Sequence, residues 1–139
     1  MSLSIRNQIP GTVTAVTSGE VMATVKVRLT GGQEITAAIT LESAEELGLA
    51  AGTAVRALVK ATEVSLATAP VAGLSIRNQL PGTVTDVTTG GAMASVKIAV
   101  DGGELTSAIT RDAVTDLALT AGTPVVALIK STEISLATA

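Results

Sequence analysis

Two arginines in matching polar segments are the side chains of this sequence best suited to bind a ligand. Arg6 lies in the segment SIRNQ at residues 4–8, and Arg77 lies in the same five residues at 75–79. A guanidinium presents a planar fork of donors that fits a tetrahedral oxyanion, and the nearby Ser4 hydroxyl and backbone N–H groups add neutral donors. The segments therefore favour anion binding. On chemistry alone, an ion pair between Arg6 and a glutamate, with Asn7 capping a turn, explains them equally well.

Lysines at matching positions carry the same ambiguity. Lys60 and Lys130 each follow a hydrophobic strand, where a lysine is usually exposed, and each precedes a glutamate that is a natural ion-pair partner. Taken alone, these lysines fit an exposed strand end better than an anion site, but they belong to the cationic set that both segments retain. Lys26 and Lys97 lie in the middle of strands, on the polar face, and are predicted to be solvated surface charges.

Hydroxyl groups at the start of a predicted helix add a third set of anion donors. Thr40 and Ser43 lie where the helix dipole and free N–H groups favour negative charge, although plain N-capping uses the same residues. At the matching positions later in the chain, Thr110 keeps the first hydroxyl, and Ala113 stands where the second would be. The polar set as a whole is cationic and rich in hydroxyls, so it points to holding a small anion rather than transforming one.

The residue types that are missing exclude several classes of function. The chain has no Cys, His, Phe, Tyr or Trp, and its 9 Lys and Arg against 12 Asp and Glu give a net charge of -3. Mechanisms that need a thiolate or imidazole, as nucleophile, base or metal ligand, have no candidate residue. Single-stranded nucleic acid binding lacks both stacking platforms and a basic surface. We therefore expect no enzyme, no metal directly ligated by side chains and no nucleic-acid partner.

The polar segments recur because the chain contains two copies of one unit. We place the first copy at residues 1–69, a short linker at 70–73 and the second copy at 74–139. Units of about 70 residues have thin cores, and mutual burial between copies or chains would stabilise them, so we expect an oligomer. The linker is short and carries Pro70 and Gly73, so we expect the two copies to pack closely rather than swing freely.

Alternating apolar residues predict a mainly β structure in each copy. The fold class is all-β, with two tandem OB-like five-stranded β-barrels, each with one short helix. In the first copy the helix is expected over 40–48. The strands are expected at Thr12–Val16, Val21–Leu29, Glu34–Ile39, Val55–Val59 and Thr62–Leu66, with the last two repeated at Val125–Ile129 and Thr132–Leu136.

Three motifs in order make each copy similar to a known family. The opening SIRNQ-(I/L)-PG, the TAAITLES helix start and the closing GTAVRALVKATEV resemble the Mop, or molybdenum-pterin-binding, domain of the molbindins. The resemblance implies storage or homeostasis of molybdate and tungstate, held as oxyanions without an organic cofactor. It implies an oxyanion site formed by Ser4, Ile5 (backbone), Arg6, Thr40, Ser43, Lys60, Ala61 (backbone), Ser75, Ile76 (backbone), Arg77, Thr110, Lys130 and Ser131, to which we add Asn7 and Asn78 as orienting groups.

The same resemblance implies partners and a cellular setting. Six Mop domains commonly assemble together, which for a tandem chain means a homotrimer with anions at contacts between domains and subunits. The alternative is a molybdate-responsive sensor that acts through a partner protein, since the chain carries no helix-turn-helix pattern of its own. No apolar run approaches the roughly 20 residues of a membrane span. The N-terminus also lacks secretory-signal features, so we expect a cytoplasmic protein without a membrane partner.

Overall fold

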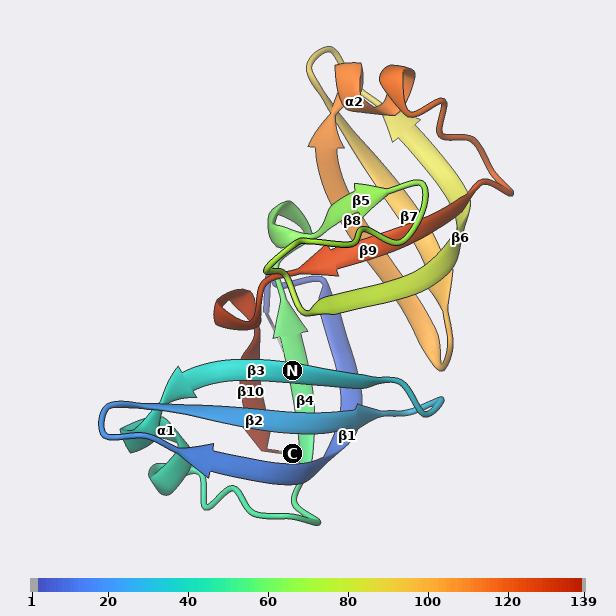
Figure 1. Ribbon diagram of the computed structural model, residues 1–139. Helices are drawn as coiled ribbons and strands as arrows, with labels where there is room; N and C mark the ends of the chain where they lie inside the picture. Colours follow the sequence, from blue (N-terminus) through green and yellow to red (C-terminus); the bar gives the residue numbers. More distant parts are fainter. Residues whose placement is uncertain (1–2, 139) are drawn as a thin grey trace.

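The computed structural model describes residues 3–138, which form two similar halves (Figure 1). The strands of the first copy are β1 (Asn7–Ser18), β2 (Met22–Leu29), β3 (Glu34–Thr40), β4 (Ala54–Val59) and β5 (Ser65–Ala67). Those of the second copy are β6 (Asn78–Thr89), β7 (Met93–Val100), β8 (Gly103–Thr110), β9 (Pro124–Ile129) and β10 (Ser135–Thr138). The helices are α1 (Leu41–Glu46) and α2 (Arg111–Asp116), and 3₁₀ turns η1 (Ala61–Glu63) and η2 (Ser131–Glu133) follow β4 and β9.

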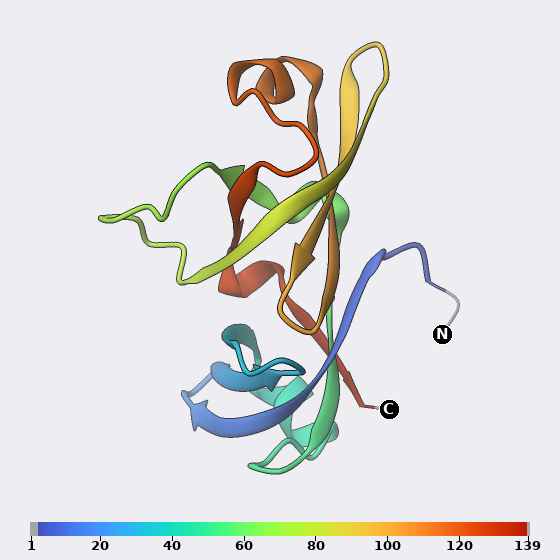
Figure 2. The ribbon, with the colours of Figure 1, turned by 90° about the vertical axis from the view of Figure 1, so that its right-hand side faces the viewer.

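The two halves exchange their last strands. One curled sheet has the order β10-β4-β1-β2-β3 and the other β5-β9-β6-β7-β8. Leu66 of the first copy thus pairs with Ala127, while Leu136 of the second copy pairs with Ala57. Figures 1 and 2 show the dark red β10 beside the green β4 in the lower half of the molecule. The predicted fold class, two five-stranded barrel-like β units, is confirmed. Nothing in the sequence indicates that the last strand of each sheet comes from the other copy.

A long first strand in each half turns from one part of its sheet to the other. Residues 7–12 of β1 pair with β4, and residues 11–18 pair with β2, with a bulge at Thr14. The bulged Thr14 donates its hydroxyl to the carbonyl of Lys26 at 3.3 Å, and Thr85 does the same for Lys97 at 3.2 Å. Gly11 lies at the bend, where a Cβ would come within 2.8 Å of the carbonyl oxygen of Arg28. A side chain there would block the curl of the sheet.

Branched aliphatic side chains form one continuous core through both halves. Val25 and Val27 are completely buried, while Lys26 between them is exposed, as the alternation predicts. Burying a Val, Leu or Ile side chain contributes about 1.5–3 kcal/mol, so the core compensates for its lack of aromatics by its number of aliphatic residues. The two copies pack closely, as the short linker predicts, because residues next to the exchanged strands belong to the shared core.

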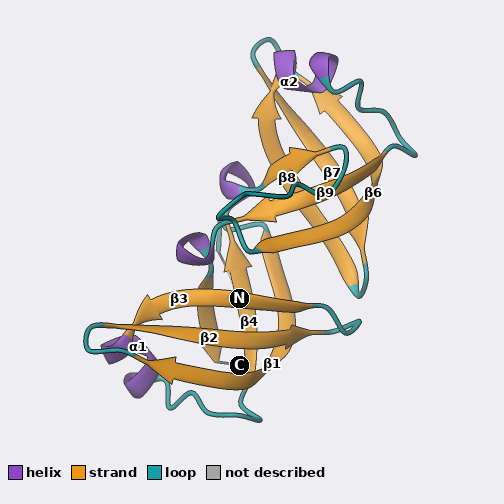
Figure 3. Cartoon of the chain, in the orientation of Figure 1, coloured by secondary structure: helices purple, strands orange, loops and turns teal. Residues whose placement is uncertain are grey.

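The last strand of each copy begins three residues later than the sequence predicts. Residues 61–63 and 131–133 are 3₁₀ turns, and the strands start at Ser65 and Ser135. The turns carry the chain out of its own sheet and onto the neighbouring one. Figure 3 shows these short turns near the junction of the halves, with α1 and α2 at the two outer ends.

The helices begin and end as the sequence predicts. The Thr40 hydroxyl accepts a hydrogen bond from the Ser43 N–H at 3.1 Å, and the Thr110 hydroxyl accepts one from the Ala113 N–H at 3.1 Å. Gly48, two residues after the end of α1, has a φ of 61°. None of the helices within residues 3–138 is long and apolar enough to cross a membrane.

Candidate functional site

Strand register brings the opening arginine and the closing lysine of the first copy together. Asn7 at the start of β1 pairs with Val59 at the end of β4 in an antiparallel ladder. The residue before Asn7 therefore lies beside the residue after Val59, and these two are Arg6 and Lys60. They share a pocket of about 340 Å³ lined by Ser4, Ile5, Arg6, Lys60, Ala61 and Thr62. We call this the first pocket.

The second copy forms a related pocket that is smaller and chemically different. Asn78 pairs with Ile129, which again places Lys130 beside the opening segment. This second pocket, about 240 Å³, is lined by Ser75, Ile76, Lys130, Ser131 and Thr132. Arg77 is exposed and does not belong to that lining. Ser131 supplies a hydroxyl where the first pocket has the methyl group of Ala61.

The charge of the first pocket favours an anionic ligand. Arg6 and Lys60 are both exposed and both cationic, and like charges held close together repel each other. The only ion pair found within residues 3–138 lies elsewhere, between Lys97 and Glu104 at 3.9 Å on an exposed strand face. A dianion between Arg6 and Lys60 would relieve their repulsion, and the hydroxyls of Ser4 and Thr62 offer further donors.

Two residue pairs at the pockets were missed by sequence reasoning. Thr62 and Thr132 line the pockets, and Gln8 and Gln79 brace the opening segments. The Gln8 side-chain amide donates to the Ile5 carbonyl at 3.1 Å, and the Gln79 amide donates to the Ile76 carbonyl at 3.3 Å. The signal that could have found all four was their retention in both copies.

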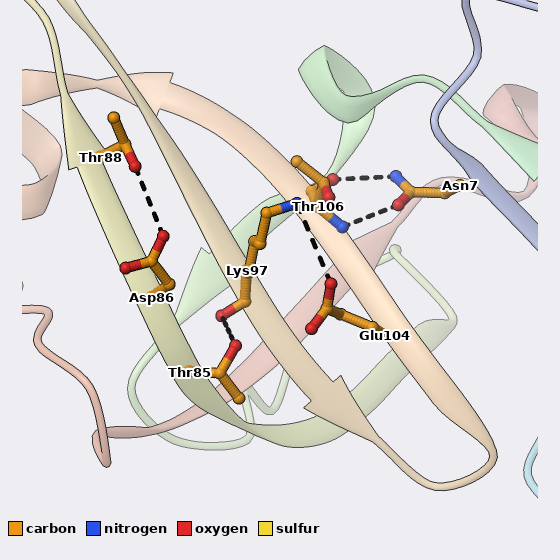
Figure 4. A network of polar contacts seen from close by, with 7 residues as sticks. All are labelled: Asn7, Thr85, Asp86, Thr88, Lys97, Glu104 and Thr106. Carbon is orange, nitrogen blue, oxygen red and sulfur yellow. Dashed lines mark hydrogen bonds and ion pairs between the residues drawn. The ribbon is translucent and has the colours of Figure 1, made fainter.

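Asn7 and Asn78 do not line either pocket. Asn7 is 2% exposed, and its amide is bound to the backbone of Thr106 in the opposite half (Figure 4). Asn78 is 3% exposed and is bound in the same way to the backbone of Thr36. Both amides are therefore anchored to an edge strand of the other copy, and their role as orienting groups stays a prediction.

The predicted helix hydroxyls lie apart from both pockets. Thr40 lines a third cavity of about 540 Å³ whose other lining residues are Glu20, Val21, Leu41, Glu42, Glu45 and Glu46. Thr40 donates its hydroxyl to the Ser43 hydroxyl at 2.8 Å, while Thr110 caps α2 at the other end of the molecule. Despite these glutamates, no three side chains within residues 3–138 are arranged to hold a metal ion. Within one chain, Thr40, Ser43 and Thr110 do not join the cationic groups.

Comparison with known proteins finds relatives over both copies of the chain. The TOBE domain family matches residues 3–66 and 74–136, which are the two copies. The chain is 41% identical over 138 residues to the molybdenum transport protein ModE of Azotobacter vinelandii, covering 99% of this chain and 51% of ModE. It is 41% identical over 141 residues to the molybdenum-pterin-binding protein MopA of Rhodobacter capsulatus, covering 99% of this chain and 52% of MopA. The chain thus spans about half the length of these curated relatives.

A solved structure matches the chain from end to end. It is a crystal structure of the cytoplasmic molybdate-binding protein ModG with molybdate bound, 44% identical, with a TM-score of 0.96 over 100% of both chains. The family match follows the internal repeat, and the structural match includes both copies. The chain therefore belongs to the TOBE-domain family, as a tandem pair of Mop-type domains.

Proposed function

We propose that this protein binds molybdate, and also tungstate, reversibly and without catalysis, as an intracellular store of the oxyanion in the cytoplasm. The observation that carries the proposal is the first pocket, where the register of β1 and β4 puts Arg6 beside Lys60. Similarity to a molybdate-bound protein over the whole chain supports the choice of ligand.

The donors of the pocket suit a tetrahedral dianion. Hydrogen bonds to charged groups contribute about 1.5–3 kcal/mol each, so a few of them suffice for tight binding. Arg6 supplies paired N–H donors, Lys60 a point charge and Ser4 a hydroxyl, which together approach the oxygens from different directions. Sulfate has the same charge and shape, so selection between the oxyanions rests on the size of the cavity.

We propose further that the sites are completed between copies of the chain in a homotrimer. Thr40, Ser43 and Thr110 lie outside both pockets of their own chain, so they can contribute only to a site shared with another chain. A ligand that binds only the assembled form stabilises it by mass action. Molybdate at a concentration 100-fold above its Kd should therefore stabilise the oligomer by about 2.7 kcal/mol. Differential scanning calorimetry measures this as a rise in Tm, and an unchanged Tm contradicts the shared site.

Isothermal titration tests the proposed ligand directly. Molybdate, tungstate, sulfate and phosphate are titrated into the wild type and into Arg6→Ala and Lys60→Ala variants. Each variant should bind molybdate with at least tenfold lower affinity at one class of site, because it loses a charge-assisted bond. Arg28→Ala is the matched control, since Arg28 is an exposed strand arginine that lines neither pocket. Equal affinities in Arg6→Ala and Arg28→Ala, or no binding by the wild type, refute the proposal.

A further inference from the structure

The two asparagines anchor each pocket to the opposite half through a pair of hydrogen bonds. The Asn7 amide donates to the Thr106 carbonyl at 2.9 Å and accepts from the Thr106 N–H at 2.7 Å. Asn78 does the same with Thr36, at 2.9 and 2.8 Å. We call these pairs the asparagine clamps. Figure 4 shows the first clamp, with the Asn7 amide facing the backbone of β8.

The clamps replace a missing strand at two sheet edges. β8 and β3 are each the last strand in their sheet, so their outward N–H and C=O groups have no strand partner. The side-chain amide of asparagine has one acceptor and donors in the same arrangement as a peptide group, and it therefore pairs with both groups of one residue. An aspartate lacks the donor, and an alanine lacks both groups.

Each clamp residue lies next to residues that line a pocket, although it does not line the pocket itself. Asn7 follows Arg6 directly, and its ladder partner Val59 directly precedes Lys60. The turn η1, which contains the pocket residues Ala61 and Thr62, packs against β8, the same strand that Asn7 holds. Both walls of the first pocket thus rest on a strand of the second copy. The second pocket rests on β3 in the same way, through Asn78 and η2.

We infer that Asn7 and Asn78 are positioning residues, each setting the anion affinity of the pocket beside it by fastening that pocket to the edge strand of the opposite half. The inference rests on the proposed anion binding and adds the residues that hold its donors in place. Groups that orient a ligand's direct contacts commonly change affinity by about 10–100-fold when they are removed, as metal sites illustrate. Each clamp should act on its own pocket only.

The test reads the two pockets separately. Lys130→Ala leaves the first pocket as the reporter, and Lys60→Ala leaves the second. Asn7→Ala and Asn78→Ala are each combined with both backgrounds, and molybdate is titrated by calorimetry. Asn7→Ala should weaken binding about tenfold or more in the Lys130→Ala background and less than about twofold in the Lys60→Ala background. Asn78→Ala should give the reverse pattern.

The crossed design separates positioning from a loss of structure. Asn7→Ala and Asn78→Ala break equivalent clamps in the same interface, so a merely structural role weakens both pockets alike in either variant. Equal effects on both pockets, or no effect, overturn the inference while the binding proposal stands. Failure of the wild type to bind molybdate overturns both the binding proposal and the inference. If Lys60→Ala or Lys130→Ala alone abolishes all molybdate binding, the two pockets do not bind independently, and the inference is overturned.

A second variant covers the case in which the alanine variants fail to fold. Thr106→Pro removes the N–H that binds Asn7 and keeps the carbonyl, and edge strands tolerate proline where the N–H points away from the neighbouring strand. This variant should lower the molybdate affinity of the first pocket, although Thr106 belongs to the second copy. A change confined to the second pocket contradicts the inference.

Discussion

The contact between the two hairpin tips offers a test of how the halves are held together. Gly102, in the β7–β8 turn, packs so closely on the β2–β3 turn that an added Cβ would overlap the carbonyl group of Thr30. Favourable carbon contacts need roughly 3.5–4.0 Å, so Gly102→Ala must push the tips apart. Gly102 also has a φ of 82°, which disfavours any other residue.

Gly32 provides a control with the same backbone problem and none of the crowding. Its φ is 101°, but a Cβ there would meet nothing within 4 Å. Gly32→Ala should therefore cost only the backbone term, about 1–2 kcal/mol. Gly102→Ala should cost about 1–3 kcal/mol more, because overpacking adds to that term.

Thermal and urea unfolding measure the difference. For a chain of this size, a change of 1 kcal/mol shifts Tm by about 3–5 °C, so Gly102→Ala should unfold roughly 3–15 °C below Gly32→Ala. Equal Tm values for the two variants would show that the tips do not press against each other in solution, and the packing argument would then be refuted.

Three further substitutions test differences between the copies. Ala118→Gly should raise the free energy of unfolding by about 0.5–1 kcal/mol, because Ala118 has a φ of 52°; an unchanged urea midpoint contradicts this. Ser107→Ala should lower it by about 1–2 kcal/mol, since the Ser107 hydroxyl donates to the buried Val64 carbonyl at 2.6 Å; urea denaturation again decides. Ala61→Ser, which gives the first pocket the hydroxyl that Ser131 gives the second, should tighten its molybdate binding about fivefold in calorimetric titration, and weaker binding would argue against a donor at that position.

Local features of the fold could be predicted because they depend on short stretches of chain. The alternation in Val21–Leu29 predicts a strand with one buried face, and β2 has that pattern. Thr40 and Thr110 cap their helices as predicted, since capping involves residues only three positions apart. The clustering of positive charge could also be predicted, because the retained opening and closing segments lie at the ends of strands that pair.

The asparagine clamps could not be predicted in the same way. Asn7 and Thr106 are 99 residues apart, and nothing near Asn7 identifies the sheet edge that its amide covers. A polar residue retained in both copies is equally compatible with a ligand contact and with a buried anchor. Burial separates these roles, and burial depends on how the halves pack.

The amino-acid sequence alone establishes the duplication, the β pattern, the helix caps and the concentration of positive charge in two retained segments. It does not establish which sheet each closing strand joins. Residues 65–68 and 135–138 are both SLAT, so their local preferences are identical, and each could pair with either sheet. The exchange is decided by the packed molecule, because strand pairing is non-local and its free energy depends on the whole surface that the two halves bury together.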